Sequence, residues 1–422
     1  MMRTSGIDFL ALEFRVKAAF SPSAPISHAD AIAGRRDQIR RLVDAVLENG
    51  KHAALFGERG VGKTSVANTF HEMISSVAPD LIIPIRKQAS PYDTFNDLWR
   101  KVFRDLKYEI DENGAYGRQS TTSVTASDIY PDDITQDDVL RQFTRHPTNA
   151  KPVVIFDEFD LVTEQKTRSL MSHTIKALTE SGTGVTVILV GIARDVETLV
   201  AEHKSVERNL AEIKMPRMSK DEMNEILDKR LPPLGIRIEG DARWKIVALA
   251  RGLPEYVHYL GREAAVRALQ QRRLVIKEED TNEAISLFLR DSDRSSYARY
   301  RKAVDSNKTN AQYKQIILAC ALTKTADEDA TFAPRDVIEP ASMILGHKVE
   351  IANFQGHLNA FASEARGHVL ERSGGPRAYR YKFVEPKMQP YVIMQGINDH
   401  VVTRDALSIL AAPEQPRLSN EF

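Results

Sequence analysis

One octapeptide constrains this chain more than any other feature of its sequence: Gly57-Glu58-Arg59-Gly60-Val61-Gly62-Lys63-Thr64. It matches the pattern G-x-x-x-x-G-K-[ST] of a phosphate-binding loop. Glycines let the backbone wrap round a phosphate with its N–H groups pointing inward. The Lys63 ammonium reaches β- and γ-phosphate oxygens, and the Thr64 hydroxyl takes a Mg²⁺ position. We add Ser65, the next residue, to the predicted nucleotide-binding set.

The surroundings of this loop are those that a phosphate-binding loop needs. A short apolar strand, His52–Phe56, precedes the loop, and a helical pattern runs from the loop towards Val77. The positive N-terminal end of that helix favours an anion. The sequence therefore predicts a site for ATP with Mg²⁺.

An acidic pair, Asp157-Glu158, follows the apolar run Val153–Phe156. We expect Asp157 to hold Mg²⁺ through water and Glu158 to orient and polarise the attacking water. The alternative is a pair of solvated acids at the end of a strand. The phosphate-binding loop upstream favours the first interpretation, and the second acid favours hydrolysis over phosphoryl transfer to a small molecule.

Apolar strands alternate with helical patterns up to about residue 218, and further strands are expected at Leu81–Ile85 and Val185–Val190. This alternation predicts an α/β fold, a P-loop NTPase parallel sheet with helices on both faces. From Ser219 helical patterns replace the strands, which predicts an all-helical lid. After residue 311 the order is helix, helix, helix, hairpin, which is the order of a winged-helix domain.

The expected organisation assigns the whole chain to domains. Residues 109–133 are polar and almost without large aliphatic side chains, so we expect a mobile insertion or loop there. Residues 291–310 are charged and are the best linker candidate. The resulting parts are an N-terminal arm (1–33), an ATPase core (34–218), a helical lid (219–290), the linker (291–310), a winged-helix domain (311–400) and a C-terminal tail (401–422).

Composition excludes several classes of protein. Lys plus Arg equals Asp plus Glu, at 58 each, so any DNA contact must come from a local patch. The single cysteine, Cys320, lies in an apolar run and is expected to be a buried, inert thiol, which fits a cytoplasmic protein. Charges interrupt the apolar residues of the N-terminus, which excludes a signal-peptide core, and no uncharged apolar stretch of about 18 residues predicts a membrane-spanning helix.

The segment Gly34-Arg35-Arg36-Asp37-Gln38, the phosphate-binding loop (Walker A) and Asp157-Glu158 (Walker B) together resemble a known family. They are similar to the initiator-like AAA+ ATPases, which include archaeal and eukaryotic origin-recognition proteins, and to bacterial AAA ATPase relatives. The order of motifs and predicted domains covers almost the whole chain. The resemblance implies a homo-oligomer with ATP at the subunit interfaces.

The same resemblance implies roles for residues outside the Walker motifs. Arg208 stands where the family carries its trans-acting arginine finger; the alternative is a surface arginine in an intramolecular ion pair. The fourth strand ends in Val190-Gly191-Ile192-Ala193-Arg194, without the Asn or Thr that usually serves as a sensor. In the lid, Glu255 replaces the usual arginine, with Arg251 just before it. An acid there repels a γ-phosphate, which predicts slow hydrolysis or a lid that closes through other contacts.

The C-terminal domain leaves two functions open. The presumed third helix buries Ile351, Phe354, Leu358, Phe361 and Ala365 and exposes amides that could read base edges. The presumed wing is basic, which suits phosphate contacts, with Tyr379 and Tyr381 on one face; its cations are Arg366, Arg372, Arg377, Arg380 and Lys382. We therefore expect an ATP-driven switch that engages DNA. The alternative is a signalling or adaptor ATPase whose winged helix recruits an effector protein.

Overall fold

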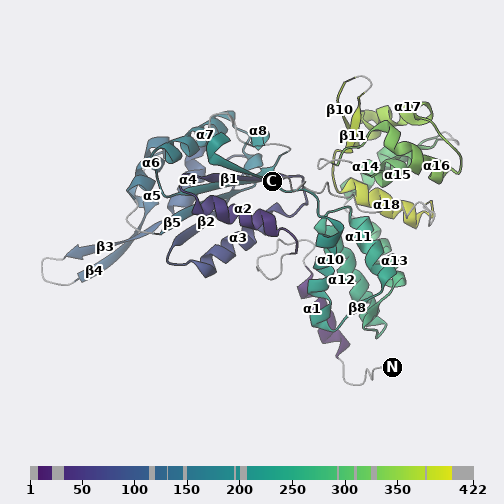
Figure 1. Ribbon diagram of the computed structural model, residues 1–422, viewed down its shortest axis with the longest axis horizontal. Helices are drawn as coiled ribbons and strands as arrows, with labels where there is room; N and C mark the ends of the chain where they lie inside the picture. Colours follow the sequence, from purple (N-terminus) through teal and green to yellow (C-terminus); the bar gives the residue numbers. More distant parts are fainter. Residues whose placement is uncertain are drawn as a thin grey trace, which may run out of the picture. The chain divides into compact units, whose positions relative to one another are not determined.

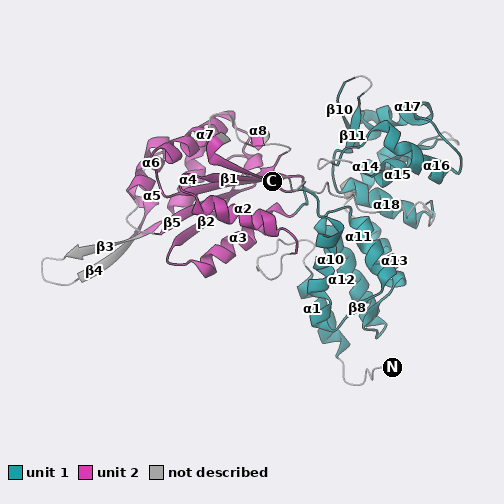
Figure 2. Cartoon of the chain, viewed as in Figure 1, with its two compact units in different colours: residues 1–24, 59–61, 216–422 teal, residues 25–58, 62–215 magenta. Residues whose placement is uncertain are grey.

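The computed structural model describes residues 8–20, 33–113, 119–130, 132–145, 150–193, 196–199, 207–291, 294–307, 311–324, 330–375 and 378–401 (Figure 1). The chain divides into two compact units, shown in different colours in Figure 2. The sheet unit comprises Pro25–Glu58 and Gly62–Met215, and the helical unit comprises Met1–Ala24, Arg59–Val61 and Pro216–Phe422. Each unit is described by itself.

A five-stranded parallel sheet forms the centre of the sheet unit, in the order β2-β5-β6-β1-β7. The inner strands carry apolar side chains on both faces, as strands covered from both sides must. All six residues of β1 are buried, as are the last six of β5. The strands are β1 (His52–Gly57), β2 (Ile82–Gln88), β5 (Lys151–Asp157), β6 (Thr186–Ile192) and β7 (Leu210–Lys214).

Helices cover the two faces of this sheet (Figure 1). The larger core packs alternate residues of the inner strands against α4, α6 and α7, and Trp99 of α4 lies at its centre with 0% exposure. The predicted α/β architecture is confirmed. The helices of the unit are α2 (Arg36–Leu47), α3 (Lys63–Val77), α4 (Phe95–Phe103), α5 (Ala126–Ile129), α6 (Gln136–Thr144), α7 (Gln165–Glu180) and α8 (Val196–Leu199), with short 3-10 turns η2 (Phe159–Leu161) and η3 (Glu207–Asn209).

The polar insertion, residues 109–133, is not the loop that the sequence predicts. Strands β3 (Lys107–Asn113) and β4 (Gln119–Thr125) pair as an antiparallel hairpin, with Lys107 opposite Thr125 and Asn113 opposite Gln119. Backbone hydrogen bonds hold such a pair, so large aliphatic side chains are not required. The threonines of β4 are β-branched and favour an extended backbone. Strand β7 was also missed, because its sequence, LAEIK, is short and half polar.

The helical unit contains the predicted lid and, unexpectedly, the N-terminal segment. Helix α1 (Phe9–Ala19) packs against α12 of the lid, burying Leu12 and Val16. Phe20 follows α1, and its ring centroid lies 5.9 Å from that of His258 on α12. The expectation of an N-terminal arm is therefore wrong for these residues. The lid helices are α10 (Lys220–Arg230), α11 (Gly240–Ala250), α12 (Pro254–Gln270) and α13 (Glu278–Asp291), with η4 (Pro232–Leu234) and a two-residue parallel pairing of β8 (Arg237–Ile238) with β9 (Val275–Ile276).

The expected linker is mostly a packed helix. Helix α14 (Arg294–Val304) buries Tyr300, Ala303 and Val304, and the Tyr300 ring lies 5.6 Å from that of Tyr391 on α18. Tyrosine and alanine supply its apolar face, so a search for large aliphatic residues does not find it.

The rest of the unit, the C-terminal module, follows the predicted order of helices and hairpin. It contains α15 (Tyr313–Leu322), η5 (Pro334–Val337), α16 (Ile338–Leu345), α17 (Ile351–Phe361), η6 (Glu364–Arg366), the antiparallel strands β10 (Leu370–Ser373) and β11 (Arg380–Phe383), and α18 (Met388–Asn398). The predicted tail, from residue 402, lies outside the described residues. Among the helices described, none has the length and apolar character needed to cross a membrane.

Candidate nucleotide-binding site

The phosphate-binding loop connects β1 to α3, and its glycines occupy positions that other residues fill poorly. Gly57 has φ +157°, and a Cβ there would lie 2.4 Å from the carbonyl oxygen of Met215. Gly62 has φ +94° and occupies the N-cap of α3. Because Gly62 has no side chain, it does not cap this helix end, which is the end of a helix that attracts anions.

Lys63 lies inside the curve of this loop. Its side chain is 8% exposed, and its Nζ donates to the carbonyl oxygens of Gly57 at 3.0 Å and Glu58 at 2.7 Å. The ammonium group is therefore held against the loop backbone, where a bound phosphate would meet it. The remaining residues of the predicted set lie on the loop or on the first turn of α3: Arg59 is exposed, Glu58, Gly60, Thr64 and Ser65 are half-buried, and Val61 is buried.

The acidic pair lies at the same end of the sheet, at the carboxyl end of β5. Strand β6 separates β5 from β1. Phe156 pairs with Leu189, and Leu189 pairs with Ala54, so Asp157 is level with Leu55, two residues before Gly57. Neighbouring strands lie about 4.8 Å apart. The backbone of Asp157 therefore lies about two strand spacings from β1.

Both oxygens of the Asp157 carboxylate accept hydrogen bonds. The residue is 2% exposed. Its Oδ1 accepts from the backbone N–H of Glu158 at 2.9 Å, and its Oδ2 accepts from Nη2 of Arg86 at 2.5 Å. Arg86 belongs to β2, the strand next to β5. A buried carboxylate at the same end of the sheet as a phosphate-binding loop suits a hydrated Mg²⁺ and a phosphate.

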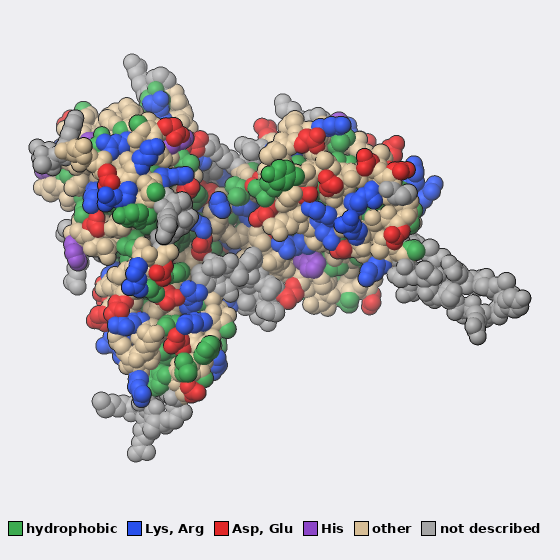
Figure 3. Space-filling view, turned by 180° about the vertical axis from the view of Figure 1, so that it is seen from behind, with side chains coloured by type: hydrophobic (Ala, Val, Ile, Leu, Met, Phe, Trp, Pro, Cys, Tyr) green, Lys and Arg blue, Asp and Glu red, His purple; other side chains and the backbone are tan. Residues whose placement is uncertain are grey.

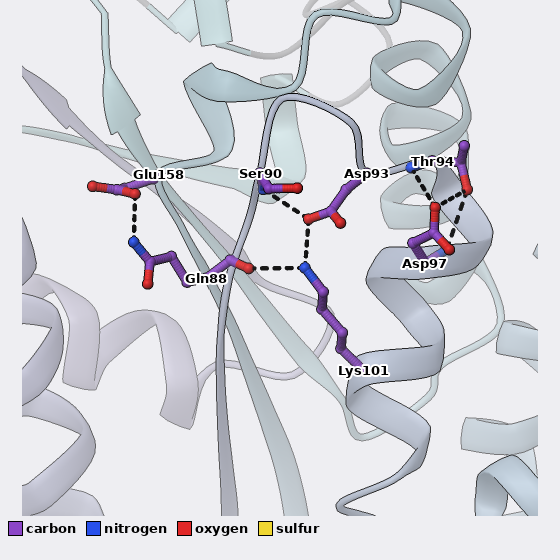
Figure 4. A network of polar contacts seen from close by, with 7 residues as sticks. All are labelled: Gln88, Ser90, Asp93, Thr94, Asp97, Lys101 and Glu158. Carbon is purple, nitrogen blue, oxygen red and sulfur yellow. Dashed lines mark hydrogen bonds and ion pairs between the residues drawn. The ribbon is translucent and has the colours of Figure 1, made fainter.

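Glu158 turns away from the line of β5 and contacts the end of β2. Its backbone is left-handed, with φ +56°. Its Oε2 accepts from Nε2 of Gln88 at 2.6 Å, as Figure 4 shows. The carbonyl oxygen of Gln88 accepts from Nζ of Lys101, whose ammonium lies 2.6 Å from the carboxylate of Asp93. The position of the Glu158 carboxylate is thus linked to the segment between β2 and α4.

This segment ends in a well-formed helix cap. The Thr94 hydroxyl accepts from the backbone N–H of Asp97, and the Asp97 carboxylate accepts from the backbone N–H of Thr94 at 3.0 Å (Figure 4). These hydrogen bonds from Thr94 hold the pKa of Asp97 below its usual range. The cap fixes where α4 begins and so anchors the far end of the Gln88 network.

Sequence analysis missed Arg86 and Gln88. A signal was present: both are polar residues in an otherwise mostly apolar strand, two positions apart, and they therefore lie on one face of β2. What the sequence could not supply was the strand order, which places β2 beside β5.

The end of β6 lacks a polar sensor side chain in the described residues. Gly191 and Ile192 pair with Phe56 and Gly57 of β1. The backbone N–H of Ile192 donates to Oδ1 of Asp160 at 2.8 Å. A Cβ at residue 191 would lie 2.8 Å from the same oxygen, so glycine allows this approach. Arg194 lies outside the described residues.

In the lid, Arg251 and Glu255 make contacts within the helical unit. Arg251 is 3% exposed, and its Nη2 donates to the carbonyl oxygen of Thr323 at 2.6 Å. Burial, with a smaller contribution from Arg217, lowers the pKa of Arg251 to about 10. The Glu255 carboxylate lies 2.7 Å from Nζ of Lys387.

Arg208 lies on η3, directly before β7, and its side chain is exposed. Its carbonyl oxygen accepts from Nζ of Lys51 at 3.1 Å. Within the described ranges, its guanidinium has no ion pair or hydrogen bond.

The described basic residues of the presumed wing each contact another side chain of the C-terminal module. Arg366 stacks on Tyr313, with its guanidinium carbon 3.9 Å from the ring centroid. Arg380 donates to the Thr331 hydroxyl, and Lys382 lies 3.7 Å from the carboxylate of Glu371. Arg372 is exposed and stacks on the Tyr379 ring at 4.6 Å, and Arg377 lies outside the described residues.

The outer face of α17 retains exposed amides. Phe354, Leu358 and Phe361 are buried as predicted, but Ile351 is only half-buried and Ala365 is exposed, because the helix ends at Phe361. Asn353 and Asn359 are exposed, and their Oδ1 atoms accept from the backbone N–H of Glu350 and from Nε2 of Gln355, respectively. Gln355 also donates to the hydroxyl of Tyr381. Tyr381 is fully buried and stacks on Phe332, so it belongs to the core of the module. On the face seen in Figure 3 basic and acidic side chains are intermixed.

The loop, the strand-end acids and the parallel sheet define the class of protein: this is a P-loop NTPase fold. Residues 46–200, which include the phosphate-binding loop and the acidic pair, match the family model of the AAA domain. This segment therefore belongs to the AAA family, which confirms the resemblance seen in the sequence. No curated protein sequence matches the chain.

Several solved structures are similar to this chain over most of its length. The Orc1 protein of Aeropyrum pernix in complex with DNA is 15% identical, with 87% of this chain and 93% of that chain covered and a TM-score of 0.46. The Cdc6p protein of Pyrobaculum aerophilum is 15% identical, with 92% and 99% covered and a TM-score of 0.47. The ORC2 protein of Aeropyrum pernix in ADPNP–ADP complexes is 13% identical, with 91% and 98% covered and a TM-score of 0.48.

Proposed function

We propose that this chain is an ATP-binding and ATP-hydrolysing AAA+ switch of the initiator-like group. One observation carries the proposal. The backbone-lined loop with its inward-held Lys63 and the buried carboxylate of Asp157 lie at the same end of one sheet, about two strand spacings apart.

Each residue has a role that follows from its position. The backbone N–H groups from Gly57 to Lys63 bind the phosphates, and the Lys63 ammonium neutralises their charge. The Thr64 hydroxyl and the Asp157 carboxylate hold the magnesium ion, and Glu158 polarises the attacking water. Bound ATP with Mg²⁺ supplies the reactive phosphoanhydride and the positive charge that stabilises its cleavage.

Hydrolysis is proposed to be slow. The Glu158 carboxylate is hydrogen-bonded to Gln88 and must leave that partner before it can orient water. At the end of β6 the described residues offer glycine and isoleucine rather than a polar side chain. Glu255 stands where the family carries an arginine in the lid, and it pairs with Lys387. Each feature removes or delays one contribution to transition-state stabilisation.

We further propose that the ATP site is completed by a neighbouring copy through Arg208, which is exposed and has no side-chain partner in the described part of the chain. A guanidinium from another subunit would stabilise the charge that develops on the γ-phosphate. The working unit is then a homo-oligomer.

DNA is the proposed partner of the C-terminal module, which we interpret as a winged helix. Exposed Asn353 and Asn359 on α17 and exposed Arg372 on strand β10 of the hairpin support this assignment. A second candidate is an effector protein. It is favoured by the engagement of Arg366, Arg380 and Lys382 within the module, which leaves fewer cations for phosphates.

Equilibrium binding of a fluorescent ATP analogue to the full chain tests the core of the proposal. Lys63→Ala should abolish binding, because it removes the side-chain cation at the phosphates. Lys176→Ala, an exposed lysine on α7, is the matched control and should bind like the wild type. Equal affinity in Lys63→Ala and the wild type would rule out this site.

A further inference from the structure

The ion pair between Arg86 and Asp157 links the proposed metal site to strand β2. Nη2 of Arg86 lies 2.5 Å from Oδ2 of Asp157, and the side chains are 28% and 2% exposed respectively. In the sheet register Gln88 is opposite Asp157, and Arg86 is opposite Ile155. The guanidinium therefore extends along the strands, by two residue positions, to reach the carboxylate.

This pair is less complete than an arginine–carboxylate pair usually is. A guanidinium has five N–H donors and pairs best through two parallel hydrogen bonds. Here the described contacts of Arg86 with Asp157 consist of the single Nη2–Oδ2 bond, and the buried Nε has no hydrogen-bond partner among the residues described. The pair therefore uses one of the two parallel hydrogen bonds that a guanidinium and a carboxylate can form.

The positive charge of Arg86 acts on α3 as well as on β5. The pKa of His71, on α3, is lowered by burial and then by the nearby Arg86 charge. Arg86 is thus a cation at the junction of β2, β5 and α3, the helix that carries Thr64 on its first turn. A divalent ion held by Thr64 and Asp157 would meet this positive charge in a poorly solvated region, where repulsion is strong.

We propose that Arg86 is a resident counter-cation of Asp157 that keeps divalent metal out of the nucleotide-free site. This inference rests on the proposed function. Without nucleotide, Arg86 compensates the buried carboxylate and competes with metal for its Oδ2. When nucleotide is bound, the phosphates add negative charge, so a metal ion gains ligands that Arg86 cannot take. Metal binding is thereby made dependent on nucleotide.

The opposite role, in which Arg86 only orients Asp157 for metal, gives the opposite result on mutation. If Arg86 competes, its removal strengthens metal binding to the nucleotide-free chain. If it merely orients the carboxylate, its removal weakens that binding.

Binding of Mn²⁺ to the full, nucleotide-free chain distinguishes these roles. The electron paramagnetic resonance signal of the free ion measures this binding. Arg86→Met should bind Mn²⁺ at least about 10-fold more tightly than the wild type. Arg86→Lys keeps a cation at this position and should stay close to the wild type. Lys87→Met removes the neighbouring cation, which pairs with Asp105 at 2.6 Å, and should change nothing. Adding Asp157→Asn to Arg86→Met should abolish the gain.

Thermal unfolding gives an independent readout of the same competition. In EDTA, Arg86→Met should unfold at a lower temperature than the wild type, because the buried carboxylate has lost its counter-cation. Mn²⁺ should raise the midpoint of Arg86→Met more than that of the wild type. Arg86→Gln is the second variant and should show the same pattern if the methionine protein does not fold.

Two results would overturn the proposal: a folded Arg86→Met or Arg86→Gln protein with unchanged or weaker Mn²⁺ affinity, or a gain that survives Asp157→Asn. Binding of the fluorescent ATP analogue to the wild type separates this failure from that of the proposed function. If the wild type binds the analogue and the Mn²⁺ result is negative, only the role of Arg86 is wrong. If the wild type does not bind the analogue, the proposed function is wrong.

Discussion

The Lys387 ammonium lies 2.7 Å from the Glu255 carboxylate, and the hydroxyl of the adjacent Tyr256 donates to the Lys387 carbonyl oxygen at 2.9 Å. The first turn of α12 is thus bound to the start of α18 by a side chain and by a backbone group. Glu255, which stands where the family carries an arginine, thus has an ion-pair partner within its own unit. Arg251, which directly follows α11 of the lid, likewise binds the C-terminal module through the carbonyl oxygen of Thr323.

Glu158→Gln should retain ATP binding and lower the hydrolysis rate by at least about 100-fold, because an amide cannot polarise water as a carboxylate does. Phosphate release and filter binding of labelled ATP measure the two properties. Glu180→Gln, at the exposed end of α7, is the control and should keep the wild-type rate. Undiminished hydrolysis in Glu158→Gln would assign the water-activating role to another group.

Arg208→Ala should bind ATP normally through its own loop but hydrolyse it about 10³-fold more slowly, if the arginine acts on a neighbouring subunit. Mixing this variant with Lys63→Ala should restore part of the activity, since one subunit supplies the arginine and the other the loop. Steady-state phosphate release of each variant and of the mixture is the measurement. A fully active Arg208→Ala protein, or a mixture without rescue, would point to an intramolecular switch.

Duplex DNA should bind the ATP-loaded chain with a micromolar-range Kd that rises steeply with salt. Fluorescence anisotropy over a salt series measures this dependence. Arg372→Ala should reduce the slope of log K against log salt by about one, as expected for one lost phosphate contact. Arg335→Ala removes another exposed arginine of the module, beside Asp336, and should leave the slope unchanged. Negligible binding at every salt concentration would favour the effector protein as partner.

The sheet unit should lose stability in mild acid because of His52. This side chain is fully buried, its Nδ1 accepts from the backbone N–H of Val187 at 2.9 Å, and burial lowers its pKa to about 3. The unfolded chain, with an ordinary histidine pKa of about 6.5, binds the proton first. The stabilisation is therefore complete above pH 6.5 and is lost as the pH falls towards 3, by about 2 kcal/mol at pH 5.

Urea unfolding at pH 7 and pH 5 measures this loss. The parent protein for these measurements carries Trp244→Phe, so that Trp99 reports on the sheet unit. His52→Asn keeps an acceptor for Val187 and should show a smaller difference between the two pH values than its parent. His347→Asn changes an exposed histidine and should keep the parental difference. Equal pH dependence in His52→Asn and its parent would show that other groups dominate.

The sequence located the two nucleotide-binding motifs but not the strand pairing around them. The phosphate-binding loop and the acidic pair were identifiable because each requires particular residues at fixed spacing, and both fall within the AAA domain. Their assigned roles remain predictions, as do slow hydrolysis, the oligomer, the DNA or protein partner and the cytoplasmic location. The contacts of Arg86 and Gln88 could not be predicted, because their partners come from a strand that is distant in sequence and adjacent only in space.

The errors in the predicted organisation share one physical cause. Helices α1 and α14 and the hairpin β3–β4 carry few consecutive large aliphatic residues, and a pattern search treats such segments as arms, linkers or loops. Helix α14 instead buries the Tyr300 ring and small residues, and β3–β4 relies on backbone pairing. Ordered structure needs satisfied backbone groups and some buried surface, and aromatic or small residues supply that surface as well as aliphatic ones do.

Strand β6 lies between the strand that ends in the phosphate-binding loop and the strand that ends in the acidic pair. The spacing between the ends of β1 and β5 is therefore set by two rows of backbone hydrogen bonds, which substitutions in β6 other than proline leave in place. Substitutions can therefore change the phosphate-binding loop and the acidic pair independently while the distance between the two strand ends stays constant. An insertion or deletion in β6 that shifts its register, by contrast, would move them relative to each other while every catalytic side chain is still present.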